Sequence, residues 1–364
     1  MAKITQSAIE SLVYFLQAAL GDVPDIRPES IDLRTVYELS KKQKLTVVSL
    51  DGLRKIVDTY PDLLQSDVST EAIKTQWIVN MVQQEKRYNT YLLAAKKLAA
   101  LYDRNELLTF VLKGFTISTL YPIPEHRFSC DLDCLLLSKK GNTSAYEIGN
   151  ILAESMGCKV DASYYKHSVF AFQGMTVENH RYCCSVKRSK RTMEIENYLK
   201  SLLKCYVPQY IPNTKLAIPP QMFQALFMIE HANGHFLYSK MSIKHMCDWA
   251  MMRKSFINTL DWHEFNKQCT RFGLMNFVEC MNHLADYILG KSSYKDLSSI
   301  EKRVLNDTFK EVQLSQNLTR QRIEKAIGVL RSSWKFKHFC KDSMMKELTH
   351  SVWAYLRENN LELD

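Results

Sequence analysis

Two aspartates separated by one residue stand at the start of an apolar run, a spacing that permits metal chemistry. The segment is Cys130-Asp-Leu-Asp-Cys134, and three leucines follow it. On a β-strand, residues i and i+2 point to the same face, roughly 6.6 Å apart. Asp131 and Asp133 are therefore expected to project together. Neighbouring carboxylates repel each other unless a cation lies between them, and Mg²⁺ or Mn²⁺ suits an oxygen-rich site. The pattern predicts a metal site for phosphate chemistry.

A third carboxylate is expected on a neighbouring strand, because two-metal phosphoryl transfer normally uses three. In the segment Thr176–Tyr182, alternation places Glu178 and His180 on one face. Glu194 and Glu196 are alternatives, but the apolar residues around them recur at helical spacing, which predicts a solvated face for both glutamates. A site without a third carboxylate is the remaining possibility.

Four motifs along the chain resemble those of a known superfamily. They are Leu112-Lys-Gly114 with Tyr121-Pro122, Arg127-x-x-x-Asp131-x-Asp133, Gly174-x-x-Val177-Glu-Asn-His180, and His231-x-x-x-His235 leading to His245-x-x-Asp248-Trp249. Their order and spacing are similar to those of the DNA polymerase beta-like nucleotidyltransferases, and most closely to a family of largely uncharacterised bacterial nucleotidyltransferases. The resemblance covers most of the chain, and it is stronger for the fold than for the reaction.

The resemblance implies a reaction and roles for individual residues. It implies transfer of an NMP from an NTP to an acceptor, with Asp131, Asp133 and Glu178 holding Mg²⁺ or Mn²⁺. It supports His180 as the companion of Glu178. Acceptors in the wider superfamily include nucleic-acid ends, proteins and small molecules, and the sequence does not choose among them or among the four bases.

The glycine motif departs from the superfamily pattern. Superfamily enzymes carry Gly-Ser or Gly-Gly where this chain has Gly114-Phe115, and the small second residue lets backbone N–H groups and a hydroxyl approach the triphosphate. Phe115 has no hydroxyl, so nucleotide binding at Gly114 depends on other groups. Lys113 is a candidate point charge for a phosphate, and Arg127 is a candidate triphosphate clamp or else a loop arginine.

Two histidines four residues apart lie on one face of a predicted helix. His231 and His235 have a spacing that can chelate zinc, but Ala232 replaces the glutamate that a metalloprotease needs. The resemblance places this pair and Asp248 in a helical domain over the core. Structural hydrogen bonding, contact with substrate or phosphate, and a zinc site that includes Cys247 are the alternatives. Asp248 lies three residues after His245, close enough on a helix to orient its ring.

Composition indicates an ordinary folded protein. The chain has 364 residues, 46% of them hydrophobic, and a net charge of +9 that suits a polyanionic partner without requiring one. The chain contains no run of 18 apolar residues, so no membrane span is expected. Polar residues interrupt the apolar residues near the N-terminus, which argues against a signal peptide. Ten cysteines without paired CxxC spacing indicate reduced thiols. A cytoplasmic protein without membrane contact is expected.

Two basic stretches are candidates for contact with phosphate or nucleic acid. Residues 187–191 contain four basic residues, and we interpret them as a solvated connector or, alternatively, a phosphate-contacting loop. Residues 331–341 interleave basic residues with Trp334, Phe336 and Phe339. That mixture is typical of a nucleic-acid surface, although aromatic residues at helical spacing more often form a packed face.

The periodicity predicts an α+β fold with three parts. Residues 1–104 are expected to form an N-terminal helical region, 105–192 a small mixed-sheet core, and 193–364 a C-terminal helical domain. The resemblance implies that 105–192 is the nucleotidyltransferase α/β core. Predicted helices after the core include 220–233, 240–255, 261–272 and 325–332. The function predicted first is metal-dependent nucleotidyl transfer. The alternatives are a catalytically inactive nucleotide-binding or regulatory protein of the same fold, and an RNA-binding module.

Overall fold

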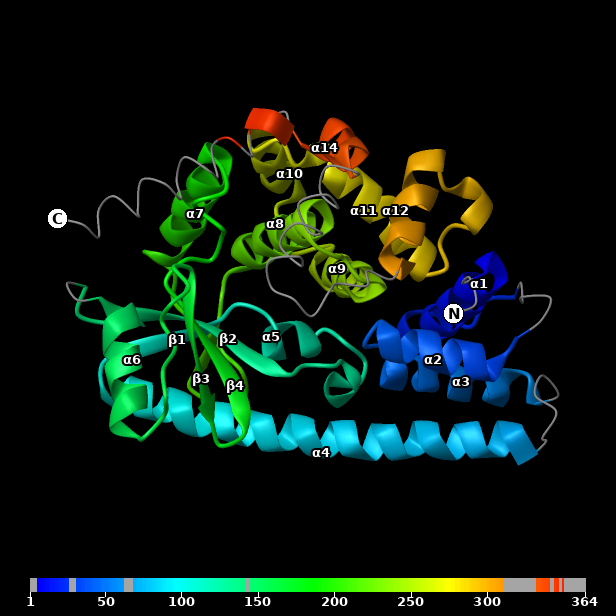
Figure 1. Ribbon diagram of the computed structural model, residues 1–364, viewed down its shortest axis with the longest axis horizontal. Helices are drawn as coiled ribbons and strands as arrows, with labels where there is room; N and C mark the ends of the chain where they lie inside the picture. The colour runs from blue at the N-terminus through cyan, green and yellow to red at the C-terminus, as the bar shows by residue number, and fades with distance from the viewer. Residues whose placement is uncertain are drawn as a thin grey trace.

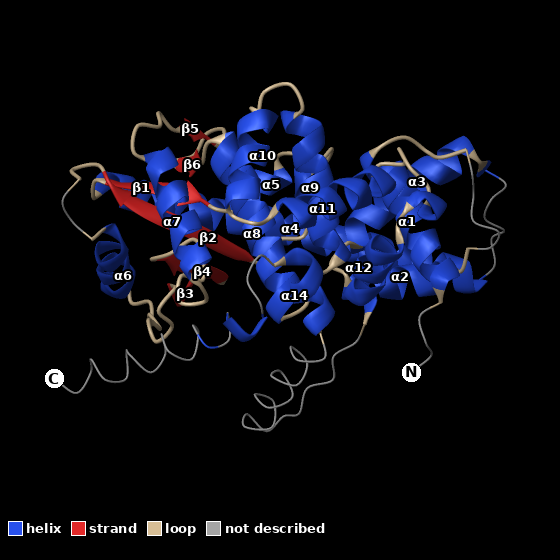
Figure 2. Cartoon of the chain, turned by 90° about the horizontal axis from the view of Figure 1, so that it is seen from above, coloured by secondary structure: helices blue, strands red, loops and turns tan. Residues whose placement is uncertain are grey.

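The chain forms the predicted α+β structure, with helices around a mixed sheet. The computed structural model describes residues 5–25, 31–61, 68–141, 144–310, 332–340, 344–346 and 349. The sheet lies at one end of the molecule, and helices from both halves of the chain fill the rest (Figures 1 and 2). Within the described ranges, no helix has both the length and the apolarity that crossing a membrane requires.

The strand order places the carboxylate-bearing strands side by side. It runs β3-β4-β2-β1-β6-β5 within the described residues. The bounds are β1 (Leu107–Val111), β2 (Asp131–Ser138), β3 (His167–Phe172), β4 (Met175–His180), β5 (Gln209–Tyr210) and β6 (Leu216–Ile218). β2 pairs antiparallel with β1 and parallel with β4. β1 and β2 are central and mostly buried, which explains their nearly continuous apolar sequences.

The helices before the sheet follow the predicted apolar periodicity. They are α1 (Gln6–Leu20), α2 (Leu33–Lys42), α3 (Thr46–Thr59) and α4 (Val68–Arg104). At about 1.5 Å per residue, α4 is about 55 Å long, and it runs beneath both the sheet and α1–α3 (Figure 1). Trp77 of α4 is fully buried against Phe15 and Tyr37, so α4 joins the N-terminal helices to the sheet.

Short elements around β2 and β4 determine which face of the sheet stays open. α5 (Phe115–Ser118) and η2 (Pro124–His126) connect β1 to β2, and α6 (Ala145–Ser155) packs on β2 and β4. Asn179 donates from Nδ2 to the Tyr146 carbonyl of α6 at 3.0 Å. Because side chains alternate along β4, Glu178 and His180 point to the opposite face of the sheet.

The second half of the chain is mostly helical but also completes the sheet. Its helices are α7 (Lys190–Leu203), α8 (Gln221–Tyr238), α9 (Ile243–Phe256), α10 (Trp262–Arg271), α11 (Met275–Ile288), η3 (Tyr294–Asp296), α12 (Ser299–Phe309) and α14 (Ser333–Phe339). The prediction of a helical domain over residues 193–364 missed two strands, because this part of the chain also contains β5 and β6, which extend the sheet beyond β1. They are two and three residues long and give no detectable period. The helix predicted at 325–332 falls outside the described residues except for Ser332.

Buried apolar residues form two clusters that cross the predicted domain limits. One cluster joins α1–α3 to α8–α12 and α14, and the other lies between the sheet, α4 and α6. α4 therefore contributes to the sheet's core although it precedes residue 105. The limits at 104/105 and 192/193 stay a prediction.

Candidate active site

The strand register brings three carboxylates to one face of the sheet. β2 and β4 run parallel, with Asp131 opposite Thr176 and Asp133 opposite Glu178. Alternation along each strand then directs Asp131, Asp133 and Glu178 away from α6. The arrangement depends on two independent local patterns, Asp-x-Asp on one strand and Glu-x-His on the other, meeting in this register.

Asp133, Glu178 and His180 form what we call the carboxylate cluster. One potential ligand atom from each lies within 4.8 Å of the others. His180 Nε2 lies 3.2 Å from Asp133 Oδ1 and 3.4 Å from Glu178 Oε2, while its Nδ1 lies 3.0 Å from the Tyr182 carbonyl. Asp131 shares the strand face but lies outside this set. His180 thus accompanies Glu178 as the sequence suggested, and it also contacts Asp133.

One buried oxygen of the carboxylate cluster has no partner. Asp133 is 0% exposed, and its Oδ2 makes no hydrogen bond to any residue that the structure describes. A buried acceptor without a partner costs about 1–3 kcal/mol. A divalent cation would satisfy this oxygen, and carboxylate oxygens are the ligands that Mg²⁺ and Mn²⁺ prefer. Asp133 and Glu178 therefore fit the predicted ion, and Asp131 shares their face of the sheet.

Nearby charges keep Asp133 ionised. Burial alone would raise the pKa of its carboxyl, but Lys113 and His180 hold that pKa well below its ordinary value. Burial and the charge of Asp133 instead raise the pKa of Asp131. Burial would lower the pKa of His180, but its hydrogen bonds to Asp133 and Glu178 give a net rise. This face of the sheet therefore carries carboxylates next to positively charged groups, and a bound cation would compete with Lys113 and His180 for the Asp133 carboxylate.

The glycine motif approaches the cluster through Lys113. Its Nζ lies 3.1 Å from Asp133 Oδ1, and burial is outweighed by the surrounding carboxylates, so the pKa of Lys113 is raised. Gly114 has φ +74° and ψ −106°, a conformation that side chains disfavour. Phe115 is buried at 1% exposure against Tyr88, with ring centres 5.4 Å apart. Phe115 therefore removes a hydroxyl without blocking the site.

Two pockets flank Lys113. The first, which we call the lysine pocket, has a volume of about 310 Å³ and includes Lys42, Lys44, Lys113, Asp131, Lys240 and Lys244 in its lining. The second, the strand pocket, has a volume of about 420 Å³ and includes Asp133, Lys166, Glu178, His180 and Arg188. Lys113, His231 and His235 line both. The carboxylates therefore divide between two adjoining spaces.

Arg127 has a different partner from the phosphate predicted for it. Its Nε donates to Asp248 Oδ1 at 2.7 Å, its Nη2 to Asp248 Oδ2 at 2.8 Å, and its Nη1 to the Gly114 carbonyl at 3.2 Å. Both side chains are almost fully buried. Such a bidentate pair fixes geometry, so Arg127 secures the Gly114 turn to α9. Arg127 also lines the lysine pocket, and its role as a triphosphate clamp stays a prediction.

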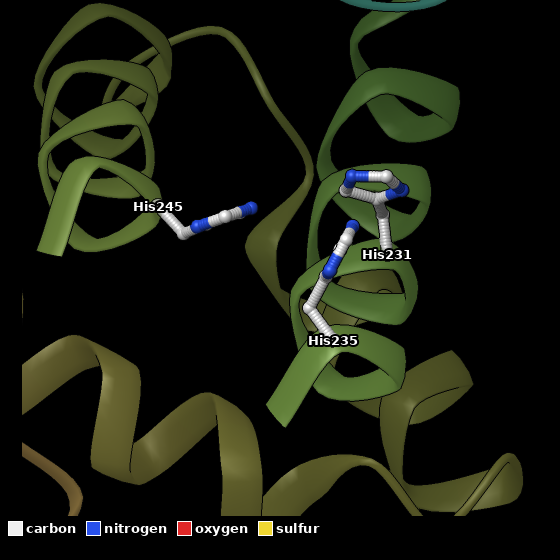
Figure 3. Close-up of side chains that lie close together, drawn as sticks. All are labelled: His231, His235 and His245. Atoms are coloured by element: carbon white, nitrogen blue, oxygen red, sulfur yellow. The ribbon is translucent and has the colours of Figure 1, made fainter. Parts of the chain in front are cut away.

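Asp248 also does not orient His245, contrary to the sequence interpretation. It accepts hydrogen bonds from Arg127, from Tyr121 Oη at 2.8 Å and from Lys244 Nζ at 3.0 Å. His245 Nδ1 instead faces Ser242. The ring of His245 lies near those of His231 and His235 (Figure 3). Trp249 is fully buried and packs in the core.

Several lining residues were not identified from the sequence. Ser129 borders the lysine pocket, and a Cβ built on Gly114 would lie 3.0 Å from Ser129 Oγ. A hydroxyl therefore stands beside Gly114 despite the phenylalanine that follows. Lys44 comes from the α2–α3 turn and Lys244 from α9, and only tertiary packing brings them here. The position of Ser129, two residues before Asp131, was the one local feature of the sequence that could have indicated this hydroxyl.

The structure also places Glu196 and several residues of the two basic stretches. Glu196 does not lie on a solvated face, because it is 1% exposed and accepts from the Cys184 N–H at 2.8 Å. In the C-terminal basic stretch, Phe336 and Phe339 are buried, which confirms the packed-face alternative. In the stretch 187–191, Arg188 lines the strand pocket, with its guanidinium 4.1 Å from the Tyr238 ring centre.

Comparison with known families gives the class of the protein. Residues 29–290 match a family described as uncharacterised nucleotidyltransferase. The match spans more than half of the chain, and the chain belongs to this family. No curated protein and no solved structure matches it. Family membership supports nucleotidyl transfer as the general activity. The matched residues include β2 and β4, which carry the carboxylates.

Proposed function

We propose that this protein transfers an NMP from an NTP to an acceptor, using Mg²⁺ or Mn²⁺ at Asp131, Asp133 and Glu178. The observation that carries the proposal is the register of β2 and β4, which opposes Asp133 and Glu178 beside an unsatisfied Asp133 oxygen. The charge pattern supports it as well, because carboxylates adjoin a lysine-lined pocket. This agrees with the resemblance to the DNA polymerase beta-like superfamily.

The lysine pocket suits the triphosphate. Lys44, Lys113 and Lys244 supply positive charge, and Ser129 supplies a hydroxyl beside the Gly114 turn. A bound divalent ion would neutralise charge on the phosphates. Lys113 keeps its charge in this buried setting, so it can pair with a phosphate when Asp133 binds the ion. Positioning and charge stabilisation are the main demands of phosphoryl transfer.

The strand pocket suits the acceptor. Glu178 lines this pocket and not the lysine pocket. In the proposed step, an acceptor hydroxyl oxygen forms a bond to the α-phosphorus while the bond from that phosphorus to the bridging oxygen breaks. Pyrophosphate leaves with the electron pair, and Glu178 takes the hydroxyl proton. Small molecules, proteins and nucleic-acid ends remain the acceptor classes.

The location that we propose is the cytoplasm, where NTPs are plentiful. All ten cysteines are unbridged, which suits a reducing compartment. Phe336 and Phe339 of the C-terminal basic stretch are buried, so they do not support the RNA-binding alternative. A nucleotide-binding protein without turnover is the alternative that the first experiment addresses.

The first test is calorimetric titration with each of the four NTPs, with and without Mg²⁺. We expect Mg²⁺-dependent binding of at least one NTP to the wild type. Asp131→Asn/Asp133→Asn should remove it, because the variant lacks two of the three ion ligands. Asp103→Asn is the matched control, since Asp103 pairs with Lys139 away from both pockets.

Two results would contradict the proposal. One is the absence of NTP binding to folded wild-type protein, and the other is equal binding by the double variant. Binding without pyrophosphate release in the presence of candidate acceptors of all three classes would instead favour the inactive nucleotide-binding protein.

A further inference from the structure

Three histidines from two helices converge opposite the sheet. His231 and His235 lie one turn apart on α8, and His245 reaches them from the first turn of α9 (Figure 3). One nitrogen of each ring lies within 4.8 Å of the others. All three are half-buried and line the lysine pocket, so an ion from solvent can reach them. We call these residues the histidine cluster.

The ring positions match those of a three-histidine metal site. With a metal–nitrogen bond of about 2.1 Å and tetrahedral angles, imidazole centres stand about 5 Å apart. The observed separations are 4.5 Å for His231–His235, 5.3 Å for His235–His245 and 6.0 Å for His231–His245. In a tetrahedral site the nitrogens lie about 3.4 Å apart, so metal binding requires the rings to move closer than the 4.8 Å limit within which they lie here.

Hydrogen bonds at the outer nitrogens favour metal binding at the inner ones. Ser239 Oγ donates to the His235 carbonyl at 3.2 Å, so it can accept at 3.0 Å from His235 Nδ1–H. His235 Nε2 then carries a lone pair. Outer-shell partners of this kind fix the tautomer of metal-binding histidines.

His245 has an equivalent arrangement. Ser242 places its Oγ at 3.0 Å and its carbonyl oxygen at 3.3 Å from His245 Nδ1, and both can accept from Nδ1–H. The Ser242 N–H also lies 3.2 Å from the same nitrogen and favours the other tautomer in the free protein. Metal binding at Nε2 selects the tautomer that donates to Ser242 oxygens.

We propose that the histidine cluster binds a zinc-class divalent ion, with an open fourth position that takes an anionic oxygen. Nitrogen ligands distinguish it from the carboxylate site proposed for Mg²⁺, because imidazole suits zinc and related ions. Three protein ligands with one open position are typical of catalytic zinc sites. Cys247, the further zinc ligand that the sequence suggested, is fully buried in the apolar core. His245 takes that place.

The surrounding charges explain why the fourth ligand should be an anion. Lys113, Lys240 and Lys244 line the same pocket as the three histidines and give it a positive potential. The same positive potential disfavours a bare dication and favours one that carries a phosphate or carboxylate oxygen.

The test uses Co²⁺, which reports its ligands by visible absorption. The full-length protein is stripped with a chelator, dialysed and titrated with Co²⁺ alone. We expect one Co²⁺ per chain with the absorption of a four-coordinate nitrogen–oxygen site, displaced by Zn²⁺. Inorganic phosphate, added last, should change the spectrum; an unchanged spectrum would overturn the open anion-binding position.

Variants assign the ion to the cluster. His235→Gln and His245→Gln should each weaken Co²⁺ binding by about 100-fold or more, since each removes one of three ligands. His263→Gln, at an exposed histidine of α10, is the matched control and should bind as the wild type does. Circular dichroism establishes that each variant is folded.

Two outcomes overturn the metal site. One is the failure of folded wild-type protein to take up stoichiometric Co²⁺. The other is binding of Co²⁺ by both glutamine variants as tightly as by His263→Gln, which would place the ion elsewhere. Neither readout involves an NTP, so failure here is distinct from failure of the proposed nucleotidyl transfer.

Discussion

The carboxylate cluster and the histidine cluster face the same pair of pockets but are built in different ways. The first stands on two hydrogen-bonded strands, and backbone register fixes the relative positions of Asp133 and Glu178. The second stands on α8 and α9, whose relative position depends on side-chain packing. Strand register is restored whenever the sheet forms, whereas a helix pair can shift by small amounts. The carboxylate cluster is therefore expected to be more rigid than the histidine cluster.

The Arg127–Asp248 pair connects the two regions and gives the largest expected effect. Arg127 precedes β2, and Asp248 lies on the same helix as His245. Asp248→Asn leaves Arg127 and Lys244 buried without their counter-charge. We expect a loss of about 3–5 kcal/mol in the free energy of unfolding, typical of a broken buried pair, measured by urea denaturation.

The control and the pH dependence sharpen that prediction. The more accessible Arg253–Asp286 pair, whose side chains are 27% and 32% exposed, should matter less, so Asp286→Asn is expected to cost under about 1 kcal/mol. Although burial would raise the pKa of Asp248, Arg127 and Lys244 lower it strongly. Its stabilisation is therefore present above the unfolded carboxyl pKa of about 3.9 and is lost as the pH falls through the lower folded value. Equal losses in Asp248→Asn and Asp286→Asn would show that the pair is not a structural link.

The second prediction separates the two clusters by their ligands. Asp133→Asn should weaken Mg²⁺-dependent NTP binding by at least about 100-fold, or about 2.7 kcal/mol, and leave Co²⁺ binding at the histidine cluster within about threefold. His235→Gln should weaken Co²⁺ binding by about 100-fold or more and should weaken NTP binding less than Asp133→Asn does, because His235 lines the lysine pocket but is not a ligand of the proposed Mg²⁺ ion. Calorimetry with NTP and absorption with Co²⁺ measure both quantities on the same preparations. If either variant impaired both ligands equally, the clusters would form one site.

The carboxylate cluster was predictable because its pattern is local. Asp-x-Asp and Glu-x-His each follow the period of two, and the apolar runs around them indicate strands. The predicted helical character of residues 1–104 also agrees with α1–α4, because each of these helices has a sustained apolar period. What the sequence alone did not provide was the hydrogen-bonded register that sets Asp133 opposite Glu178.

The remainder of the site depends on contacts between distant segments. Lys44 and Lys244 are 200 residues apart in the chain and meet only in the folded lysine pocket. His245 was paired with Asp248 because of their i, i+3 spacing, but Arg127 outcompetes His245 for that carboxylate. β5 and β6 are too short to show alternation. Local spacing predicts that two residues share a helical face, but it does not predict which other side chain each of them hydrogen-bonds to.

Substitution of Gly114 tests how closely NTP binding beside the carboxylate cluster depends on the turn at this glycine. Its φ of +74° is unfavourable for a side chain, and an added Cβ would approach Ser129 Oγ at 3.0 Å. Gly114→Ala is expected to lower the free energy of unfolding by about 2 kcal/mol and to weaken NTP binding, because Lys113 and Ser129 both shift. Gly157→Ala, also at positive φ but in open space, is the control for strain without a neighbour. Equal effects on NTP binding in the two variants would contradict a role for the turn.

His126 gives a pH-dependent test of the segment that precedes β2. Its Nδ1 contacts Asp51 on α3 at 2.7 Å, and its Nε2 contacts Glu85 on α4 at 2.9 Å. Burial would lower the pKa of His126, but these hydrogen bonds raise it. The stabilisation is therefore complete below the unfolded histidine pKa of about 6.5, and it is lost as the pH rises through the higher folded value.

The corresponding measurement compares unfolding at pH 6 and pH 9. The wild type should lose about 1–2 kcal/mol over this range, the usual value of charged hydrogen bonds. His126→Gln should lose less, while the exposed-site control His263→Gln should follow the wild type. A steeper loss in His126→Gln than in the wild type would reverse the assigned sign.

Gly234 provides the smallest expected effect, on the helix side of the comparison. It lies between His231 and His235 on α8, and an added Cβ would meet Arg188 Nη1 at 2.7 Å. Because that atom ends a flexible side chain, Arg188 can move, and alanine favours a helix interior by up to about 1 kcal/mol over glycine. Gly234→Ala should therefore change the free energy of unfolding by under about 1 kcal/mol in urea denaturation, against the larger loss for Gly114→Ala. A loss as large as that of Gly114→Ala would mean that α8 is held as rigidly as the carboxylate cluster, and the contrast between the two regions would fail.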